Sequence, residues 1–216
     1  MTQLALDLSR APGFLASDFL EAECNREAAY WIARWPAWPD FALALAGPAG
    51  SGKSHLAHIF AAHSGAEIVP APELTIATVG ELAEDEGVVL EDADRGVDET
   101  ALFHLYNLLK EHHRPLLLTG RLPPNRWAVT LPDLKSRLAT LTVAAIGAPD
   151  DQLLQALLVK LFSDRQVRIG PEIITYLLPR IERSFAAVHA LVEKLDQEAL
   201  RQGRAITLPL IRAVIT

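Results

Sequence analysis

The feature that most constrains this chain is a glycine-rich run at residues 47–54, which reads Gly-Pro-Ala-Gly-Ser-Gly-Lys-Ser. The run matches the pattern G-x-x-x-x-G-K-[ST], with an apolar stretch at 41–46 before it and helical spacing at 55–63 after it. Glycines let successive backbone N–H groups face a phosphate, and the positive end of the helix dipole adds to the attraction. The sequence therefore predicts a phosphate-binding loop between a buried strand and a helix, in which Lys53 meets the β- and γ-phosphates and the Ser54 hydroxyl binds Mg²⁺. The residues expected to hold the phosphates are Gly47, Pro48, Ala49, Gly50, Ser51, Gly52, Lys53, Ser54 and His55.

Strand and helix signals alternate around this loop. Short apolar runs typical of buried parallel strands occupy 41–46, 66–69, 88–90, 116–119 and 140–146, and helical spacing occupies 18–35, 55–63 and 99–113. This alternation of strands and helices predicts a three-layer α/β domain with a parallel five-stranded sheet at 14–147. After a Gly-Ala-Pro break at 147–149 come four helical segments, at 150–162, 171–178, 184–201 and 208–215. We expect a small all-helical domain at 148–216.

Two acidic residues, Glu91 and Asp92, directly follow the apolar run 88–90. Phosphoryl chemistry needs a carboxylate at the end of a neighbouring strand to hold Mg²⁺, and often a second one to orient the attacking water. Here Glu91 would join Ser54 on the metal side and Asp92 would polarise the water, which inverts the common order of Asp before Glu. Since in-line geometry tolerates little misplacement, we expect slow hydrolysis even where binding is tight. The alternative is that Glu91, Asp92 and Asp94 form a solvated turn.

Composition limits the classes of partner. The chain has 20 Lys+Arg against 27 Asp+Glu, and its net charge of −7 repels a nucleic-acid backbone, so direct sequence-specific DNA binding is not expected. Its single cysteine, Cys24, cannot form an internal disulfide and suits a reducing cytoplasm. No stretch approaches the roughly 20 apolar residues that cross a bilayer, and the N-terminus lacks a leader pattern. We expect a cytoplasmic protein without membrane contact.

Several motifs together resemble one family. The Gly-Lys-Ser-His-Leu of 52–56 is similar to the glycine loop of the bacterial replication initiator DnaA and its shorter relatives, which are AAA+ proteins. Residues 118–124 resemble the family's sensor-1 strand, 131–138 its arginine-finger segment, and 181–183 the sensor-2 element of its lid. The resemblance implies an AAA+ domain that binds ADP or ATP with Mg²⁺, and it identifies 148–216 as a lid domain.

The resemblance also implies roles for single residues. Arg137 is similar to the arginine finger, which stabilises charge on the γ-phosphate in the site of a neighbouring subunit. Arg183 resembles the sensor-2 arginine, which couples the nucleotide to the lid angle, although it could instead be an ordinary surface arginine at a helix start. Thr119 is the expected sensor-1 residue, and Arg121 stands where the family usually has an acidic residue. Asn25 is expected to contact the nucleotide near the adenine.

A second motif lies at residues 3–8, Gln-Leu-Ala-Leu-Asp-Leu. It is similar to the short sliding-clamp-binding motif that opens the Hda members of the DnaA-related family. The Gln3 amide would hydrogen-bond in a polar pocket while the leucines enter an apolar groove. The residues expected to bind the clamp are Gln3, Leu4, Leu6 and Leu8, within a flexible segment 1–13. The alternative is an edge strand, because the leucines also fit a period of two.

The resemblance implies a regulator of replication initiation. Residue 216 follows the lid-like helices so closely that no DNA-binding domain like that of DnaA is expected after them. The protein would bind the DNA polymerase sliding clamp, present Arg137 to ATP-bound DnaA and stimulate hydrolysis of that ATP, which inactivates the initiator. Homo-oligomers are compatible with this family. The alternative function is an autonomous AAA+ ATPase such as a helicase loader, whereas a small P-loop kinase would need an acceptor pocket that the sequence does not suggest.

Overall fold

A parallel five-stranded sheet organises the computed structural model, which describes residues 14–215. Its strands are β1 (Ala42–Ala46), β2 (Glu67–Pro70), β3 (Val88–Glu91), β4 (Leu116–Gly120) and β5 (Thr142–Ala145), in the order β2-β3-β4-β1-β5. All five predicted strands are confirmed. Because β1 pairs with both β4 and β5, and β3 with β4, the loops that follow β1, β3 and β4 meet at one edge of the sheet.

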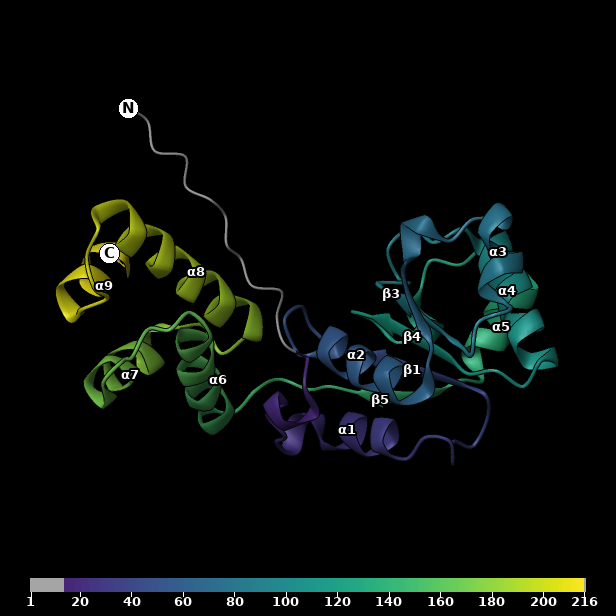
Figure 1. The fold of residues 1–216 in the computed structure, drawn as a ribbon, viewed down its shortest axis with the longest axis horizontal. Coiled ribbons are helices and arrows are strands. Elements are labelled where there is room, and N and C mark those ends of the chain that lie inside the picture. Colours follow the sequence, from purple (N-terminus) through teal and green to yellow (C-terminus); the bar gives the residue numbers. More distant parts are fainter. Residues whose placement is uncertain (1–13, 216) are drawn as a thin grey trace.

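Helices cover both faces of the sheet, so the predicted three-layer arrangement is confirmed (Figure 1). On β1, Leu43 and Leu45 pack with α1 (Arg26–Ala33) and α2 (Lys53–Ser64), whereas Ala42 and Ala44 pack on the other face. That second face is covered by three helices, α3 (Ile76–Leu82), α4 (Glu99–Glu111) and α5 (Pro132–Ala139). The period-two alternation of a strand thus divides the apolar residues of β1 between two cores.

The N-terminal helix predicted at 18–35 is wrong in extent. The α-helix begins only at Arg26, and short 3-10 turns at Ala16–Asp18 and Glu23–Asn25 precede it. The cause is the Asn25 side chain, whose Oδ1 accepts from the Ala22 N–H at 2.8 Å and whose Nδ2 donates to the Leu20 carbonyl at 2.8 Å. Such local side-chain bonds offer the backbone an alternative to the helix. The segment therefore arrives at α1 as an irregular loop.

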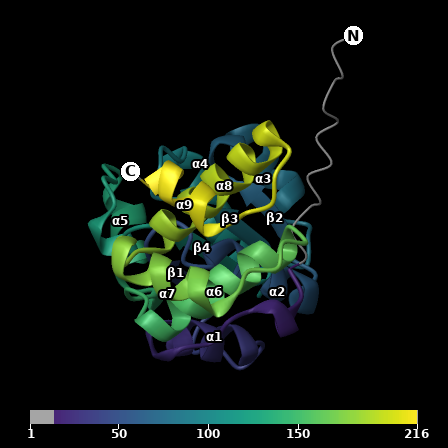
Figure 2. The same ribbon diagram turned by 90° about the vertical axis from the view of Figure 1, so that its left-hand side faces the viewer.

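Four helices form the second part of the chain, as predicted: α6 (Asp151–Asp164), α7 (Pro171–Leu177), α8 (Phe185–Gln202) and α9 (Leu208–Ile215). They enclose a separate apolar core that includes Leu158, Phe162 and Val192. Asp150 and Ser184 cap α6 and α8 by accepting from the backbone N–H groups of Leu153 and Ala187. Figure 2 shows these helices in front of the α/β domain.

Two residues of the helical part, Leu153 and Phe185, are buried in the core that α1 and α2 share with the sheet. The start of α6 and the start of α8 therefore pack on the α/β domain, and the start of α8 lies beside Gly50 of the glycine loop. Within residues 14–215, no helix has the length and apolar character to span a membrane.

Candidate phosphate-binding site

The glycine loop, residues 47–54, leaves β1 at the edge of the sheet that it shares with β4. The Gly47 N–H donates to the Gly120 carbonyl at 3.1 Å, which fixes the start of the loop. Gly50 and Gly52 have φ values of +75° and +91°, a conformation that favours glycine. A Cβ at Gly47 would lie 2.8 Å from the Ile146 Cβ. The path of the loop therefore depends on its glycines, as the sequence pattern predicts.

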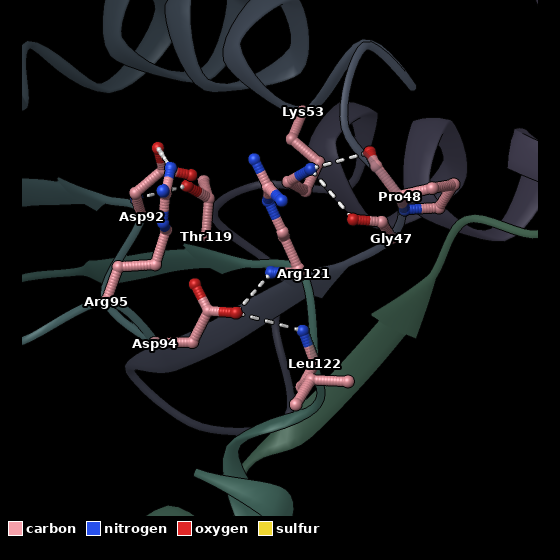
Figure 3. A network of polar contacts seen from close by, with 9 residues as sticks. All are labelled: Gly47, Pro48, Lys53, Asp92, Asp94, Arg95, Thr119, Arg121 and Leu122. Carbon is pink, nitrogen blue, oxygen red and sulfur yellow. Dashed lines mark hydrogen bonds and ion pairs between the residues drawn. The ribbon is translucent and has the colours of Figure 1, made fainter. Parts of the chain in front are cut away.

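Lys53, the first residue of α2, lies inside this loop with 8% of its surface exposed. Its Nζ donates to the carbonyls of Gly47 at 2.8 Å and Pro48 at 2.9 Å (Figure 3). Burial lowers the pKa of Lys53, whereas the carboxylates of Asp92 and Asp94 act to raise it. A buried cation thus sits where backbone N–H groups and the start of a helix converge, which is an arrangement that binds anions.

The acidic residues of the turn after β3 lie opposite Lys53. Asp92 has a φ of +52°, and its N–H donates to the Thr119 Oγ1 at 3.0 Å. The Thr119 carbonyl accepts from the Ala93 N–H at 2.8 Å. Thr119 is buried and therefore fixes the backbone of the acidic turn, while the Asp92 carboxylate lies 3.8 Å from a guanidinium nitrogen of Arg95.

Two carboxylates, one at the end of β3 and one in the turn after it, each have a buried oxygen, whereas the alternative interpretation expects a solvated turn. Glu91 Oε1 and Asp94 Oδ1 are buried and have no hydrogen-bond partner among the described residues. Asp94 Oδ2 accepts from the N–H groups of Arg121 at 2.7 Å and Leu122 at 3.2 Å. A buried carboxylate oxygen without a partner is costly, so these atoms are suited to a ligand such as a cation or water.

The donor set fits an Mg²⁺ ion that arrives with a phosphate. Residues 14–215 contain no group of three His, Cys, Asp or Glu side chains that could hold a metal by themselves. Mg²⁺ in phosphate sites takes one or two carboxylates and completes its shell with phosphate oxygens and water. Ser54, on the first turn of α2, and Glu91 offer oxygen donors of this kind.

The side chains of Asn25 and His55 make their described contacts within the N-terminal segment. Both polar atoms of the Asn25 amide are occupied by Leu20 and Ala22. His55 Nε2 lies 2.8 Å from the Leu15 carbonyl oxygen, and its ring packs edge to face on Phe19. Asn25 and His55 thus hold the segment that precedes α1. This segment approaches the glycine loop, because a Cβ at Gly52 would lie 3.0 Å from the Phe19 ring. Direct contact of these two side chains with a nucleotide stays a prediction.

The helical domain reaches the loop through α8, at residues that sequence reasoning missed. A Cβ at Gly50 would lie 3.0 Å from the His189 ring, 3.4 Å from the Phe185 Cβ and 3.5 Å from the Ala186 nitrogen. Burial lowers the pKa of His189, and a hydrogen bond with the Gly50 backbone opposes that shift. Phe185 and His189 are four residues apart and thus share a face of α8, which is the only signal that the sequence offers for this contact.

Arg183 lies on the loop before α8, and its side chain binds a carboxylate of the helical domain. Its Nε and NH2 donate to the two carboxylate oxygens of Asp151 at 2.8 and 3.1 Å. Both side chains are largely exposed, 72% and 61%. The arginine is thus held at the start of α6, and its predicted contact with a phosphate stays a prediction.

Arg137 is separated from the glycine loop. It lies on α5, at the end of the molecule opposite the helical domain (Figure 1). Its guanidinium stacks over Phe103 of α4, 4.5 Å from the ring centroid, and has no carboxylate partner among residues 14–215. The other predicted residues outside the cluster, Gln3, Leu4, Leu6 and Leu8, precede the described part of the chain.

Comparisons with known proteins bear on the fold and on the helical domain. Residues 150–215 match the family model described as Hda, lid domain. An uncharacterized protein from Haemophilus influenzae is 27% identical over 183 residues, which cover 78% of this chain and 79% of that protein.

Two DnaA structures share the fold. Domain III of the replication initiation protein DnaA from Thermotoga maritima matches with a TM-score of 0.78 at 17% identity, over 95% of this chain and 98% of that one. AMPPCP-bound DnaA from Aquifex aeolicus matches with a TM-score of 0.67 at 16% identity, over 88% of this chain and 67% of that one. The chain therefore shares the fold of DnaA domain III, and its residues 150–215 match the Hda lid domain.

Proposed function

We propose that this protein is a nucleotide-dependent regulator of replication initiation whose partner is DnaA. The Hda lid match at 150–215 and the DnaA-like fold of the whole described chain support this class of function. The AMPPCP in the similar A. aeolicus structure supports ATP or ADP as the ligand of the glycine loop.

Within its own site, the chain would bind the nucleotide phosphates with the backbone N–H groups of the loop and the Lys53 ammonium. Mg²⁺ would be held by Ser54 and Glu91 and would neutralise charge on the phosphates. Asp92, whose backbone Thr119 fixes, would orient a water molecule. Phe185 and His189 lie against Gly50, so they would relay the state of this site to the lid.

The observation that carries the proposal is the position of Arg137. Its guanidinium is bound to no carboxylate in the described chain and lies partly buried against α4, and the helix that carries it, α5, lies at the end of the molecule opposite the lid (Figure 1). An arginine in this place would act on the nucleotide of a neighbouring AAA+ subunit, where it stabilises the charge that develops on the γ-phosphate. The ATP hydrolysed would be that of DnaA, which is thereby inactivated.

A sliding-clamp tether would make this contact efficient. Residues Gln3, Leu4, Leu6 and Leu8 would bind the clamp, and the linkage would raise the effective concentration of a weak contact between two AAA+ domains. Removal of residues 1–8 should therefore lower stimulation on clamp-loaded DNA much more than stimulation at high protein concentration without the clamp.

The test is to mix the protein with clamp-loaded DNA and ATP-bound DnaA and to follow conversion of ATP to ADP. We expect Arg137→Ala to abolish the stimulated hydrolysis while clamp binding and nucleotide binding remain. Lys135→Ala is the matched control, because Lys135 is an exposed cation of the same helix. Stimulation that survives in Arg137→Ala would exclude the mechanism.

One observation favours a second candidate, an autonomous ATPase such as a helicase loader. The unpartnered, buried Glu91 Oε1 beside Lys53 is suited to metal-assisted hydrolysis in the protein's own site. Turnover of ATP without DnaA separates the two candidates. A loader should hydrolyse ATP in the presence of helicase or DNA and should not need residues 1–8, whereas the regulator should bind nucleotide and turn it over slowly by itself.

A further inference from the structure

Glu99, the first residue of α4, binds the backbone just ahead of α5. Its Oε1 accepts from the Thr130 N–H at 3.0 Å, and its Oε2 accepts from the N–H groups of Thr130 at 3.0 Å and Leu131 at 2.7 Å. The Thr130 hydroxyl also donates to Oε2 at 3.0 Å. A side chain of one helix thus holds the residues that lead into another, 31 and 32 positions further along the chain.

The start of α5 depends on this carboxylate because its own residues supply little. Leu131, the N-cap residue, makes no side-chain cap, and Pro132 has no backbone N–H. A negative charge near the N-terminus of a helix also suits the helix dipole. The hydrogen bonds from the N–H groups of Thr130 and Leu131 lower the pKa of Glu99, so the carboxylate is ionised at neutral pH.

A second contact joins the same two helices one turn further along α4. The Arg137 guanidinium lies 4.5 Å from the centroid of the Phe103 ring. Glu99 and Phe103 are four residues apart and so share a face of α4. Leu131 precedes α5 and Arg137 lies in its last turn. The face of α4 that carries Glu99 and Phe103 therefore contacts α5 near both of its ends.

The apolar contacts of α5 leave its position along α4 to these polar groups. Leu134 and Leu138 are buried in the core beneath the helix, which fixes the face that α5 turns to the sheet. Apolar burial is not directional, whereas a hydrogen bond requires a defined distance and angle between donor and acceptor. The bonds of Glu99 to residues 130–131 thus define how far α5 lies along α4.

We propose that Glu99 is a positioning residue for Arg137: by holding residues 130–131 it sets the position of α5, and with it the point at which the Arg137 guanidinium reaches a neighbouring subunit. This inference rests on the proposed role of Arg137 and adds the residue that determines its geometry. A misplacement of about 1 Å can lower the rate of a reaction by about a hundredfold, so a small shift of α5 is enough to matter.

The experiment is to follow hydrolysis of DnaA-bound ATP on clamp-loaded DNA over a range of concentrations of the full chain. We expect Glu99→Ala to lower the rate at saturation about tenfold, because a displaced Arg137 stabilises the transition state less well. The half-saturating concentration should change less than about twofold, since the substitution leaves the rest of the surface of α5 in place.

Two further substitutions separate the reach of the side chain from its charge. Glu99→Gln keeps the length and one acceptor oxygen, so its rate at saturation should lie between those of Glu99→Ala and the wild type. Glu99→Asp keeps the charge at the start of α4 but is one methylene shorter, and should resemble Glu99→Ala. A wild-type rate in Glu99→Asp would show that only the charge matters and would overturn the positioning role. If Glu99→Ala does not fold, a higher rate in Glu99→Gln than in Glu99→Asp is the expected result.

Glu111→Gln is the matched control, because Glu111 is an exposed carboxylate at the other end of α4. Its rate at saturation should equal that of the wild type. Thermal unfolding and calorimetric titration with ADP test whether each variant keeps its fold and its own nucleotide site. We expect unchanged ADP affinity, because the hydrogen bonds of Glu99 go to residues 130–131 and not to the glycine loop.

The outcomes separate the inference from the function beneath it. If Arg137→Ala abolishes stimulation, three results in Glu99→Ala would overturn the inference alone: a wild-type rate at saturation, a change confined to the half-saturating concentration, or a parallel loss of ADP affinity. Wild-type protein that does not stimulate hydrolysis, or Arg137→Ala protein that does, would overturn the proposed function and the inference together.

Discussion

The guanidinium of Arg137 lies 4.5 Å from the centroid of the Phe103 ring. It is also 5.8 Å from the Tyr106 ring, so two aromatic residues of α4 form the surface on which the arginine rests. The approach to α5 is fixed as well, because the Glu99 carboxylate accepts from the backbone N–H groups of Thr130 and Leu131. One guanidinium nitrogen donates to the Asp133 carbonyl at 3.4 Å, and the contact with ring faces uses none of the other donors, which suits an arginine that must act on another molecule.

Phe103→Leu should weaken the proposed effect on DnaA without disturbing the protein's own nucleotide site. The substitution keeps an apolar side chain but removes the cation–π contact, which is worth about 0.5–1 kcal/mol at exposed sites. We expect stimulated hydrolysis to fall about two- to fivefold. Phe103→Tyr keeps a ring and should retain the wild-type rate. A fall in the ADP or AMPPCP affinity of Phe103→Leu would show instead that the whole domain is perturbed.

Lys53→Ala should remove most of the nucleotide affinity. The Lys53 ammonium is buried in the glycine loop and is its most central cation, so its loss removes charged hydrogen bonds to phosphate worth about 1.5–3 kcal/mol. The expected loss is roughly ten- to a hundredfold for both ADP and AMPPCP, measured by calorimetry. Lys110→Ala changes the same charge on the exposed end of α4 and should bind both nucleotides like the wild type. Unchanged affinity in Lys53→Ala would rule out the glycine loop as the phosphate site.

The parts of the structure that the sequence predicts are those with local causes. The buried strands are runs such as Leu116–Gly120, which begins with three leucines because both faces of a parallel sheet are covered. The glycine loop is specified by eight adjacent residues, and the cap of α4 by Asp98 alone. In each case the determining residues lie within a few positions of the feature itself.

The contacts that sequence reasoning missed join residues far apart in the chain. Arg183 bonds to Asp151, 32 positions away, and Asp94 binds the N–H of Arg121, 27 positions away. The sequence does not show that the two residues of such a pair lie together, because each contact depends on how the lid or the loops pack. The helix predicted at 18–35 failed for the opposite reason, since the local Asn25 hydrogen bonds overrode a favourable apolar spacing.

Gly50→Ala and Gly80→Ala should have opposite effects on stability. At Gly50 the φ of +75° and the His189 ring 3.0 Å from the added Cβ both oppose alanine, so we expect a loss of about 1 kcal/mol or more in the free energy of unfolding. At Gly80, within α3, the added Cβ meets no atom within 4 Å, and alanine should stabilise the helix by roughly 0.5–1 kcal/mol. Denaturant unfolding of the two variants measures both. A Gly50→Ala protein as stable as the wild type would contradict the close packing of the loop on α8.

His189 should make the contact between the lid and the glycine loop sensitive to mild acid. Burial lowers its pKa below the ordinary value of 6.5, nearby Arg165 lowers it further, and the hydrogen bond with the Gly50 backbone opposes both. As the pH falls below 6.5, the unfolded chain therefore takes up a proton on this residue before the folded chain does. The free energy of unfolding should thus decrease as the pH is lowered from about 6.5 toward the folded pKa, with a slope of at most about 1.36 kcal/mol per pH unit from one proton.

Urea unfolding between about pH 5 and 8 measures the slope, which should be smaller in His189→Gln. His63→Gln, at an exposed position of α2, should keep the wild-type slope. The free energy of unfolding could instead fall with pH equally steeply in the wild type and in His189→Gln. In that case His189 would not be the group through which acid weakens the contact of α8 with Gly50.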